Sequence, residues 1–308
     1  MRAPGKLASE MEKLRELREG LWLLDTDQFG VPHFGGVYIL RSGDEAALVE
    51  TGTSLAAPAV LKALDALGIA RQAVRKIFLT HIHLDHGGGA GVLVRELPEA
   101  VVVVHERGAK HLVDPAKLLA SVKEAVGERF PLYGTAEPVP RGRIEPVGDE
   151  KMFRVGDVRI WAVPTPGHAP HHLCFFLPET GELFTGDAAG LYLQGKLYPT
   201  TPPPGFHLER ALESLKRLAR LQPKRLFYTH FGPGEVPERL LHKYMGFLEW
   251  WVQKIEAARN SETSEEEALA KLLSDPEVTA YAYSGDRDMG ELAMNIRGVL
   301  VYLSRRGK

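Results

Sequence analysis

Cysteine is almost absent from this chain, and its scarcity excludes a fold held together by disulfides. Cys174 is the only cysteine among 308 residues, so no bridge can form within the chain. Its apolar neighbours Leu173 and Phe175 indicate a thiol buried in a strand rather than a metal ligand. A chain of this length can bury a sufficient core without disulfides, and we expect a cytoplasmic protein.

The chain also has little that would attract it to membranes or nucleic acids. Residues 1–19 are rich in Lys, Arg and Glu and contain no apolar run typical of a signal peptide, and no run is long enough to span a membrane. The formal net charge of -2 gives no general attraction to phosphate backbones. We therefore expect a small-molecule substrate and neither a nucleic acid nor a membrane as partner.

Short apolar runs alternate with amphipathic segments over most of the chain, and this alternation predicts an α/β layered fold. Strands are expected at residues 21–24, 37–40, 46–49, 77–80, 101–104, 159–163, 173–177, 183–185 and 225–229. Helices are expected around residues 54–67, 92–93 and 208–221, the first of them capped by Ser54 and ended by Gly68. A short N-terminal helix is predicted from the helical spacing of Leu7, Met11, Leu14 and Leu17.

Two regions depart from this alternation. In residues 105–154 helical stretches are followed by interruptions at Pro131, Pro138, Pro140 and Pro146, and the region is interpreted as a helical insertion in a main domain of residues 1–235. Residues 236–308 form a predicted C-terminal helical extension, in which Ser264 with Glu267 and Asp288 with Glu291 have the spacing of capping boxes. The insertion and the extension are expected to wall a pocket or to support a homodimer.

The segment Thr80-His81-Ile82-His83-Leu84-Asp85-His86 follows a strongly apolar strand and carries three histidines and one carboxylate within six residues. Residues two apart in an extended chain point to one side, so His81 and His83 can bind one ion. Imidazole and carboxylate together suit zinc, iron or manganese. The segment therefore predicts a metal site.

Three single residues, His168, Asp187 and His230, lie just beyond predicted strand ends, in loops punctuated by Gly or Pro. Side chains at the edge of a sheet can converge on one point. Together with the first segment these residues supply five histidines and two aspartates. That number is sufficient for two metal ions that share one bridging carboxylate.

The ordered series His-x-His-x-Asp-His, His, Asp, His, spread over residues 20–234, resembles the metallo-β-lactamase superfamily. The resemblance implies a four-layer αβ/βα sandwich with two divalent metal ions, most often zinc, with iron or manganese as alternatives. It further implies that the first ion is bound by His81, His83 and His168, and the second by Asp85, His86 and His230, with Asp187 bridging the two.

The chain departs from the common family pattern at two positions. Glu50-Thr51-Gly52 stands where many members have Asp-Thr-Gly, so the partner of a ligand histidine is longer by one methylene group. The fourth motif reads His168-Ala169-Pro170-His171-His172, in which His172 matches a later family histidine and His171 replaces glycine. His171 is either a polar group near the site or an ordinary structural residue.

Two cations that share a water lower its pKa from near 16 to about 7, so hydroxide is available at neutral pH. The resemblance assigns Asp85 the orientation of this nucleophile. Tyr192 is the first candidate for the proton donor to the leaving group, with Tyr198 and His207 as alternatives in the same loop. The stretch 28–36 is either an apolar flap over the site or a hairpin tip.

The function expected from this pattern is metal-dependent hydrolysis of a thioester, lactone or carboxylic ester. His83 together with His86 favours hydrolysis, because flavodiiron redox relatives carry glutamate at position 83. A mononuclear iron enzyme of the persulfide dioxygenase kind, which would use His81, His83, His168 and Asp187 differently, is the alternative. An RNA phosphodiesterase and a non-catalytic metal-binding protein are further alternatives; the near-neutral charge and the intact ligand series disfavour them.

Overall fold

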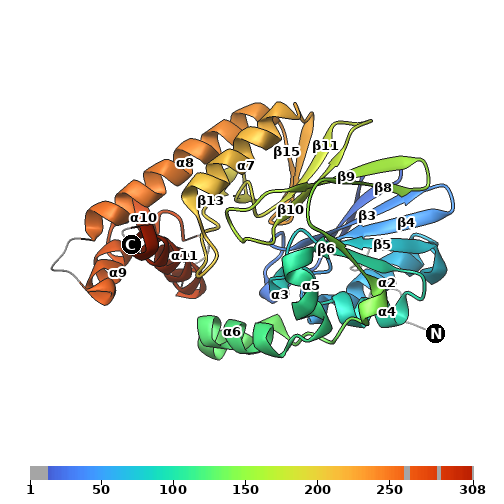
Figure 1. The fold of residues 1–308 in the computed structure, drawn as a ribbon, viewed down its shortest axis with the longest axis horizontal. Helices are drawn as coiled ribbons and strands as arrows, with labels where there is room; N and C mark the ends of the chain where they lie inside the picture. Colours follow the sequence, from blue (N-terminus) through green and yellow to red (C-terminus); the bar gives the residue numbers. More distant parts are fainter. Residues whose placement is uncertain (1–12, 260–263, 283–285, 307–308) are drawn as a thin grey trace.

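Two β-sheets packed face to face form the centre of the molecule in a computed structural model that describes residues 13–259, 264–282 and 286–306 (Figure 1). The first sheet has seven strands in chain order, parallel from β4 onward and antiparallel before it. Its strands are β1 Leu14–Arg18, β2 Leu21–Asp25, β3 Gly36–Ser42, β4 Glu45–Val49, β5 Val74–Phe78, β6 Val101–His105 and β7 Ile144–Val147.

The second sheet has six strands in the order β15-β14-β11-β10-β9-β8, and only β11 and β14 pair in parallel. Its strands are β8 Lys151–Val155, β9 Val158–Pro164, β10 Leu173–Leu177, β11 Glu182–Gly186, β14 Arg225–Tyr228 and β15 Gly232–Gly234. A separate hairpin consists of β12 Leu191–Leu193 and β13 Lys196–Tyr198.

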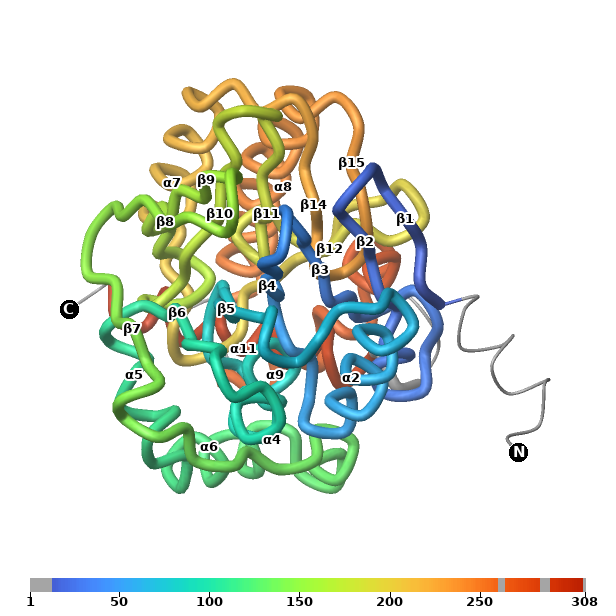
Figure 2. The backbone as a smooth tube through the Cα atoms, turned by 90° about the vertical axis from the view of Figure 1, so that its right-hand side faces the viewer, coloured from blue at the N-terminus to red at the C-terminus, as the bar shows by residue number. Residues whose placement is uncertain are grey.

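Helices cover the outer face of each sheet, as Figures 1 and 2 show from two directions. The first sheet is covered by α2 (Ala57–Ala66) and α4 (Ala90–Glu96), and the second by α7 (Leu208–Arg220) and α8 (Pro237–Ala258). Aromatic residues such as Phe78 and Phe175 fill the space between the sheets. The predicted four-layer αβ/βα sandwich is confirmed.

The C-terminal helical extension is present and shares a core with the second sheet. It consists of α8, α9 (Glu265–Leu273), α10 (Pro276–Thr279) and α11 (Asp286–Arg306). Trp251 and Ile296 are completely buried in the same apolar cluster as Leu183 and Leu226 of the sheet. Within the described ranges, no helix is long and apolar enough to cross a membrane.

The predicted N-terminal helix is wrong where it can be compared. Leu14 and Leu17 belong to β1, which pairs with β2 at the edge of the first sheet, whereas Leu7 and Met11 lie outside the described residues. Spacings of three and four residues over so short a segment do not distinguish a helix from an edge strand.

The region interpreted as a helical insertion is helical only in its first part. It contains α5 (Glu106–Val113), α6 (Ala116–Val126) and a 3-10 helix at Gly127–Tyr133. After residue 143 it supplies β7 and β8, which are edge strands of the two sheets. Pro146 is compatible with β7 because an edge strand has one side without ladder partners.

Two predicted N-terminal helix caps are wrong, whereas one N-terminal cap and the predicted glycine end of α2 are confirmed. Ser54 does not cap α2, since its Oγ accepts a hydrogen bond from Thr135 N at 2.9 Å. Asp288 lies inside α11 rather than at its start. Ser264 and Glu267 form the predicted capping box of α9, and Gly68 follows the end of α2 in the left-handed conformation.

Candidate metal centre

All seven predicted ligand residues come together at one edge of the sandwich, although they are spread over residues 81–230 of the sequence. His81 and His83 follow β5, and Asp85 and His86 lie on the short helix α3 (Leu84–Gly87). The remaining ligand residues follow β9, β11 and β14 of the second sheet; they are His168, Asp187 and His230. The site thus depends on the packing of both sheets against each other.

Three imidazole nitrogens face one another in the first group of ligands. His81 Nε2 lies 2.9 Å from His83 Nδ1, and His168 Nε2 lies 3.2 and 3.1 Å from these two atoms. Nitrogens at these separations can surround one ion, and imidazole is a preferred ligand of zinc.

The second group combines two imidazoles with a carboxylate. His230 Nε2 lies 3.1 Å from His86 Nε2. Asp85 Oδ2 lies 3.6 Å from His230 Nε2 and 3.7 Å from His86 Nε2. Like the first group, this set suits a divalent transition-metal ion such as zinc.

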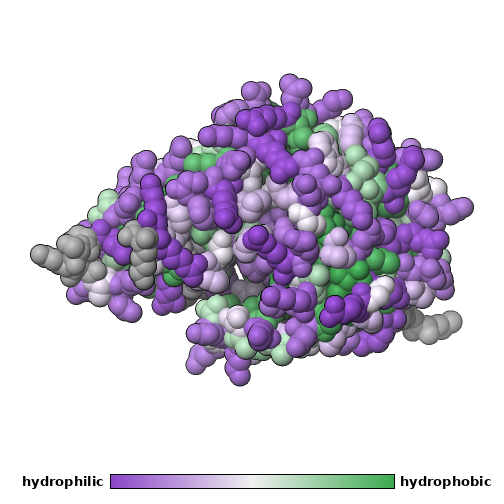
Figure 3. Space-filling view, viewed as in Figure 1, coloured by the Kyte–Doolittle hydropathy of each residue, from purple (hydrophilic) through white to green (hydrophobic). Residues whose placement is uncertain are grey.

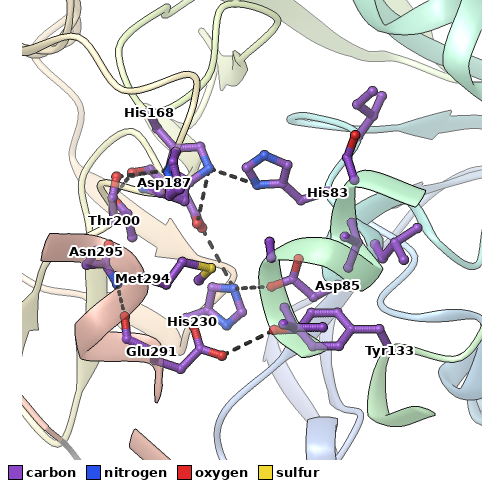
Figure 4. A pocket seen from close by; sticks show the side chains of 18 of the residues that line it. His83, Asp85, Tyr133, His168, Asp187, Thr200, His230, Glu291, Met294 and Asn295 are labelled. Carbon is purple, nitrogen blue, oxygen red and sulfur yellow. Dashed lines mark hydrogen bonds and ion pairs between the residues drawn. The ribbon is translucent and has the colours of Figure 1, made fainter. Parts of the chain in front are cut away.

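Asp187 stands between the two groups (Figure 4). Its Oδ2 lies 3.6 Å from His168 Nε2 in the first group, and its Oδ1 lies 3.3 Å from His86 Nε2 in the second. Oδ1 is buried and has no hydrogen-bond partner in the part of the chain that the structure describes. A buried carboxylate oxygen without a partner is costly unless a cation or a water completes its environment.

Groups outside the centre fix the orientation of the ligand imidazoles. His168 Nδ1 donates to the carbonyl oxygen of Thr200 at 3.0 Å, and His230 Nδ1 donates to that of Phe34 at 2.7 Å. A carbonyl oxygen can only accept, so Nδ1 carries the proton and Nε2 presents a lone pair to the centre. Phe34 and Thr200 were not predicted, since backbone carbonyls leave no mark in a sequence.

Glu50 contacts His86 as the sequence suggests. The carboxylate is completely buried and accepts hydrogen bonds from His86 Nδ1 at 3.0 Å and from Thr229 Oγ1 at 3.2 Å, as well as from Thr80 Oγ1. The backbone of Glu50 has a φ of 70°, which is rare outside glycine. The Glu50 side chain, which is one methylene longer than the aspartate of many family members, thus reaches His86 from a left-handed backbone position.

The charges of the site favour a bound cation. Burial lowers the pKa of His81 well below its usual range, which keeps this imidazole neutral and able to bind a metal. Burial also lowers the pKa of His86, but nearby carboxylates outweigh this effect and raise it to about 10. The carboxylates are those of Asp187, Asp85 and Glu50. The second group therefore requires a positive charge, which a divalent ion would supply.

The two histidines of the fourth motif have different surroundings. His172 Nε2 accepts a hydrogen bond from Asp187 N at 3.1 Å, and its Nδ1 donates to Thr165 Oγ1 at 2.8 Å, so His172 positions the backbone of Asp187. The His171 ring lies 5.9 Å from the His83 ring and lines the cavity beside the centre. Of the two interpretations of His171, the polar group near the site is the one that fits the structure.

The centre opens into a cavity of about 740 Å³ that lies between α6, α11 and the β12–β13 hairpin, where the space-filling view shows a hollow (Figure 3). Phe29 and Phe34 line it, so the stretch 28–36 forms part of its wall. Further apolar lining comes from α6 and α11, including Leu118, Val122 and Leu292. A cavity of this size and polarity suits an apolar organic molecule.

The three candidates for the proton donor differ in whether they line the cavity. Tyr192 stacks on Tyr228 with ring centroids 5.2 Å apart, and it is not among the residues that line the cavity. His207 precedes α7 and lies beside Glu209, also away from the lining. Tyr198 does line the cavity.

Two further polar residues of the cavity were not predicted from the sequence. They are Tyr133, at the end of the 3-10 helix, and Glu291 on α11. The sequence pattern connects Glu291 only with a capping box, and neither residue belongs to a motif of the ligand series.

Comparison with known proteins agrees with this geometry. The sequence profile of the metallo-beta-lactamase superfamily matches residues 30–230. The chain is 31% identical over 217 residues to the metallo-beta-lactamase fold-containing protein ST1585 of Sulfurisphaera tokodaii, an alignment that covers 69% of this chain and 78% of that protein. It is also 28% identical over 151 residues to an atrochrysone carboxyl ACP thioesterase of Emericella nidulans, covering 49% of this chain but only 38% of the thioesterase.

Solved structures show the same fold over nearly the whole chain. The crystal structure of ST1585 has a TM-score of 0.68 and 26% identity, and it covers 91% of this chain and 98% of its own. The metallo-beta-lactamase family protein TTHA1429 from Thermus thermophilus has a TM-score of 0.69 and 26% identity, with 95% of both chains covered. The chain belongs to the metallo-beta-lactamase superfamily and is a metal-dependent hydrolase.

Proposed function

We propose that this protein is a dinuclear metallohydrolase that cleaves an apolar carbonyl substrate, namely a thioester, a lactone or a carboxylic ester. The observation that carries the proposal is the position of Asp187, whose two oxygens face different ligand groups. A single ion bound by His81, His83 and His168 would leave the second group, Asp85, His86 and His230, without a role.

Zinc is the metal that we expect at both positions, because imidazole nitrogens predominate and each group offers few ligands. Two such ions would supply hydroxide at neutral pH and polarise the substrate carbonyl. Asp85 is the most exposed carboxylate of the centre, with 21% of its side chain accessible, and it lines the cavity. It is therefore the residue placed to orient a nucleophile towards a bound substrate.

The cavity favours a substrate with an apolar body. Helix α6 has an apolar face but no fully buried residue, because this face borders the cavity instead of packing on a sheet. An acyl group along Leu118 and Val122 would remove this apolar surface from water, which contributes roughly 0.8 kcal/mol for each buried methylene group. The thioesterase among the similar proteins supports an acyl substrate.

A substrate panel with the zinc-loaded full-length protein tests the proposal. We expect hydrolysis of acyl thioesters, lactones or alkyl esters, with kcat/KM rising up to roughly fourfold for each added methylene group. Val122→Asp should lower kcat/KM for long acyl chains and leave acetyl esters nearly unchanged, since only long chains reach α6. His81→Ala should abolish hydrolysis and lower the metal content.

Two results would contradict the proposal. One is the absence of hydrolysis over the whole panel by protein that carries its full metal content. The other is one bound iron per chain together with oxygen consumption on glutathione persulfide, which the mononuclear dioxygenase alternative predicts.

A further inference from the structure

We infer that Tyr133 donates the proton to the leaving oxygen of the substrate and that Glu291, which is paired with Arg129, holds the Tyr133 hydroxyl in position. The inference rests on the proposed function, because it names the residue that completes hydrolysis of an ester or lactone. Tyr133 and Glu291 lie outside the ligand series, on the helical insertion and on the C-terminal extension.

The two side chains form a hydrogen-bonded pair although they are 158 positions apart. Tyr133 OH lies 3.1 Å from Glu291 Oε1. Arg129 Nη2 lies 2.6 Å from the same oxygen and fixes the carboxylate in place. Tyr133 is only 6% exposed, and both Tyr133 and Glu291 line the cavity that contains the metal ligands. The pair is therefore ordered, and it faces the space that a substrate would occupy.

The pair is close to the second ligand group. In Figure 4, Tyr133 and Glu291 extend towards each other beside Asp85 and His230. Burial raises the pKa of Glu291 and the guanidinium of Arg129 lowers it, and the ion pair with Arg129 holds the carboxylate in place.

The other tyrosines of the cavity are engaged elsewhere. Lys196 Nζ lies 5.2 Å from the ring centre of Tyr198 and 4.4 Å from that of Tyr281, so these two rings form a cation–π cluster with it. Tyr192 is not among the lining residues. The Tyr133 hydroxyl, by contrast, is hydrogen-bonded to a partly buried carboxylate that lines the cavity.

Water supplies a hydroxyl group to the acyl carbon, the bond from that carbon to the leaving oxygen breaks, and both bonding electrons go to the leaving oxygen. This oxygen takes the proton of the Tyr133 hydroxyl. The proton that the water released then restores the Tyr133 hydroxyl, so no further reactant is needed.

A proton donor matters only when the leaving group is a strong base, and this requirement provides the test. Two esters of the same acid are compared, one with an alkyl alcohol and one with nitrophenol as leaving group. For Tyr133→Phe we expect kcat on the alkyl ester to fall roughly 100-fold, in the range typical of general acid catalysis, while kcat on the nitrophenyl ester stays within about threefold. Glu291→Gln keeps the shape of the side chain and should show the same selectivity to a smaller degree.

Tyr302→Phe is the matched control. Its hydroxyl also bonds to a glutamate, at 2.7 Å from Glu209 Oε1, but the residue does not line the cavity. This substitution should change neither ester. Metal content should remain unchanged in all three variants, because none of these residues is a ligand.

A second readout does not depend on turnover. An alkyl phosphonate monoester imitates the tetrahedral state and places an ester oxygen where the leaving group would lie. Its Kd, measured by calorimetry, should rise roughly two- to tenfold in Tyr133→Phe, as expected for one lost hydrogen bond, and should not change in Tyr302→Phe.

The outcomes separate the inference from the proposed function. If the wild-type protein hydrolyses both esters and Tyr133→Phe loses the same factor on each, the inference is overturned and the hydrolase function stands. The same holds if Tyr192→Phe, and not Tyr133→Phe, loses activity selectively on the alkyl ester. If the wild-type protein hydrolyses neither ester nor any substrate of the panel, the proposed function fails and the inference fails with it.

Discussion

At the scale of single residues, the centre depends on hydrogen-bond acceptors that are not themselves predicted metal ligands. Each of His86, His168 and His230 has one nitrogen directed to the centre and the other hydrogen-bonded to an acceptor outside it. Such outer partners fix the tautomer and raise the basicity of the ligand nitrogen. Among these partners Glu50 is the one side chain, so substitution can test its contribution.

Glu50→Gln is predicted to weaken metal binding roughly 10- to 100-fold. The native carboxylate accepts hydrogen bonds from Thr80, His86 and Thr229, whereas an amide offers one acceptor oxygen and puts a further donor group where the second oxygen was. Competition with a chelator measures the effect. Glu45→Gln, at the start of the strand that Glu50 follows and half-exposed, should leave the affinity unchanged, and an unchanged affinity in both variants would contradict the assigned role of Glu50.

The sequence predicts the residues of the centre better than it predicts those of the cavity. His81 to His86, His168, Asp187 and His230 belong to a motif series, because metal binding restricts residue type and spacing. Tyr133 and Glu291 meet only in the folded molecule, and many residue types in many positions could line the same space. No local pattern identifies such a pair.

At the scale of elements, the position of α11 determines whether Glu291 reaches the cavity. Thr201 Oγ1 donates to the carbonyl oxygen of Asn295 at 2.8 Å, and Trp251 Nε1 donates to Thr201 Oγ1 at 3.2 Å. At Gly298 the helix approaches the backbone of residues 201–203 so closely that any Cβ would overlap with Thr201 O. Glycine is required there by the contact itself.

Gly298→Ala is accordingly predicted to lower the free energy of unfolding by about 1–3 kcal/mol, the usual cost of overpacking. Thermal or urea unfolding measures this change. Gly246→Ala on α8 is the control, since no atom lies within 4 Å of its added Cβ and alanine favours the helix by roughly 1 kcal/mol. Equal stability of the two variants would show that α11 is free to shift away from residues 201–203.

Most strands lie in regular apolar runs and were predicted, whereas the edge strands β1 and β7 lie in irregular segments and were missed. Residues 101–104 and 173–177 are continuous apolar runs and form β6 and β10 as expected. β1 and β7 lie at sheet edges, where alternation is weak and Pro146 is tolerated, so their sequences resemble a helix and a loop. Edge strands receive much of their definition from the neighbouring strand and not from their own sequence.

At the scale of the whole molecule, the hydrolytic centre and the cavity have different origins in the chain. Loops after strands of both sheets carry the predicted metal ligands, whereas the cavity walls come largely from α6 in the insertion and α11 in the extension (Figure 1). The extension shares the apolar core of the second sheet, so it is integral to the fold. The cytoplasmic location and the homodimer expected from the sequence stay predictions.

The central claim, that Asp187 joins two metal positions in one centre, is tested most directly by metal quantitation on the purified full-length protein. Mass spectrometric analysis of protein equilibrated with excess zinc and freed of unbound metal should give two ions per chain. One ion per chain under the same conditions would contradict the two-metal centre.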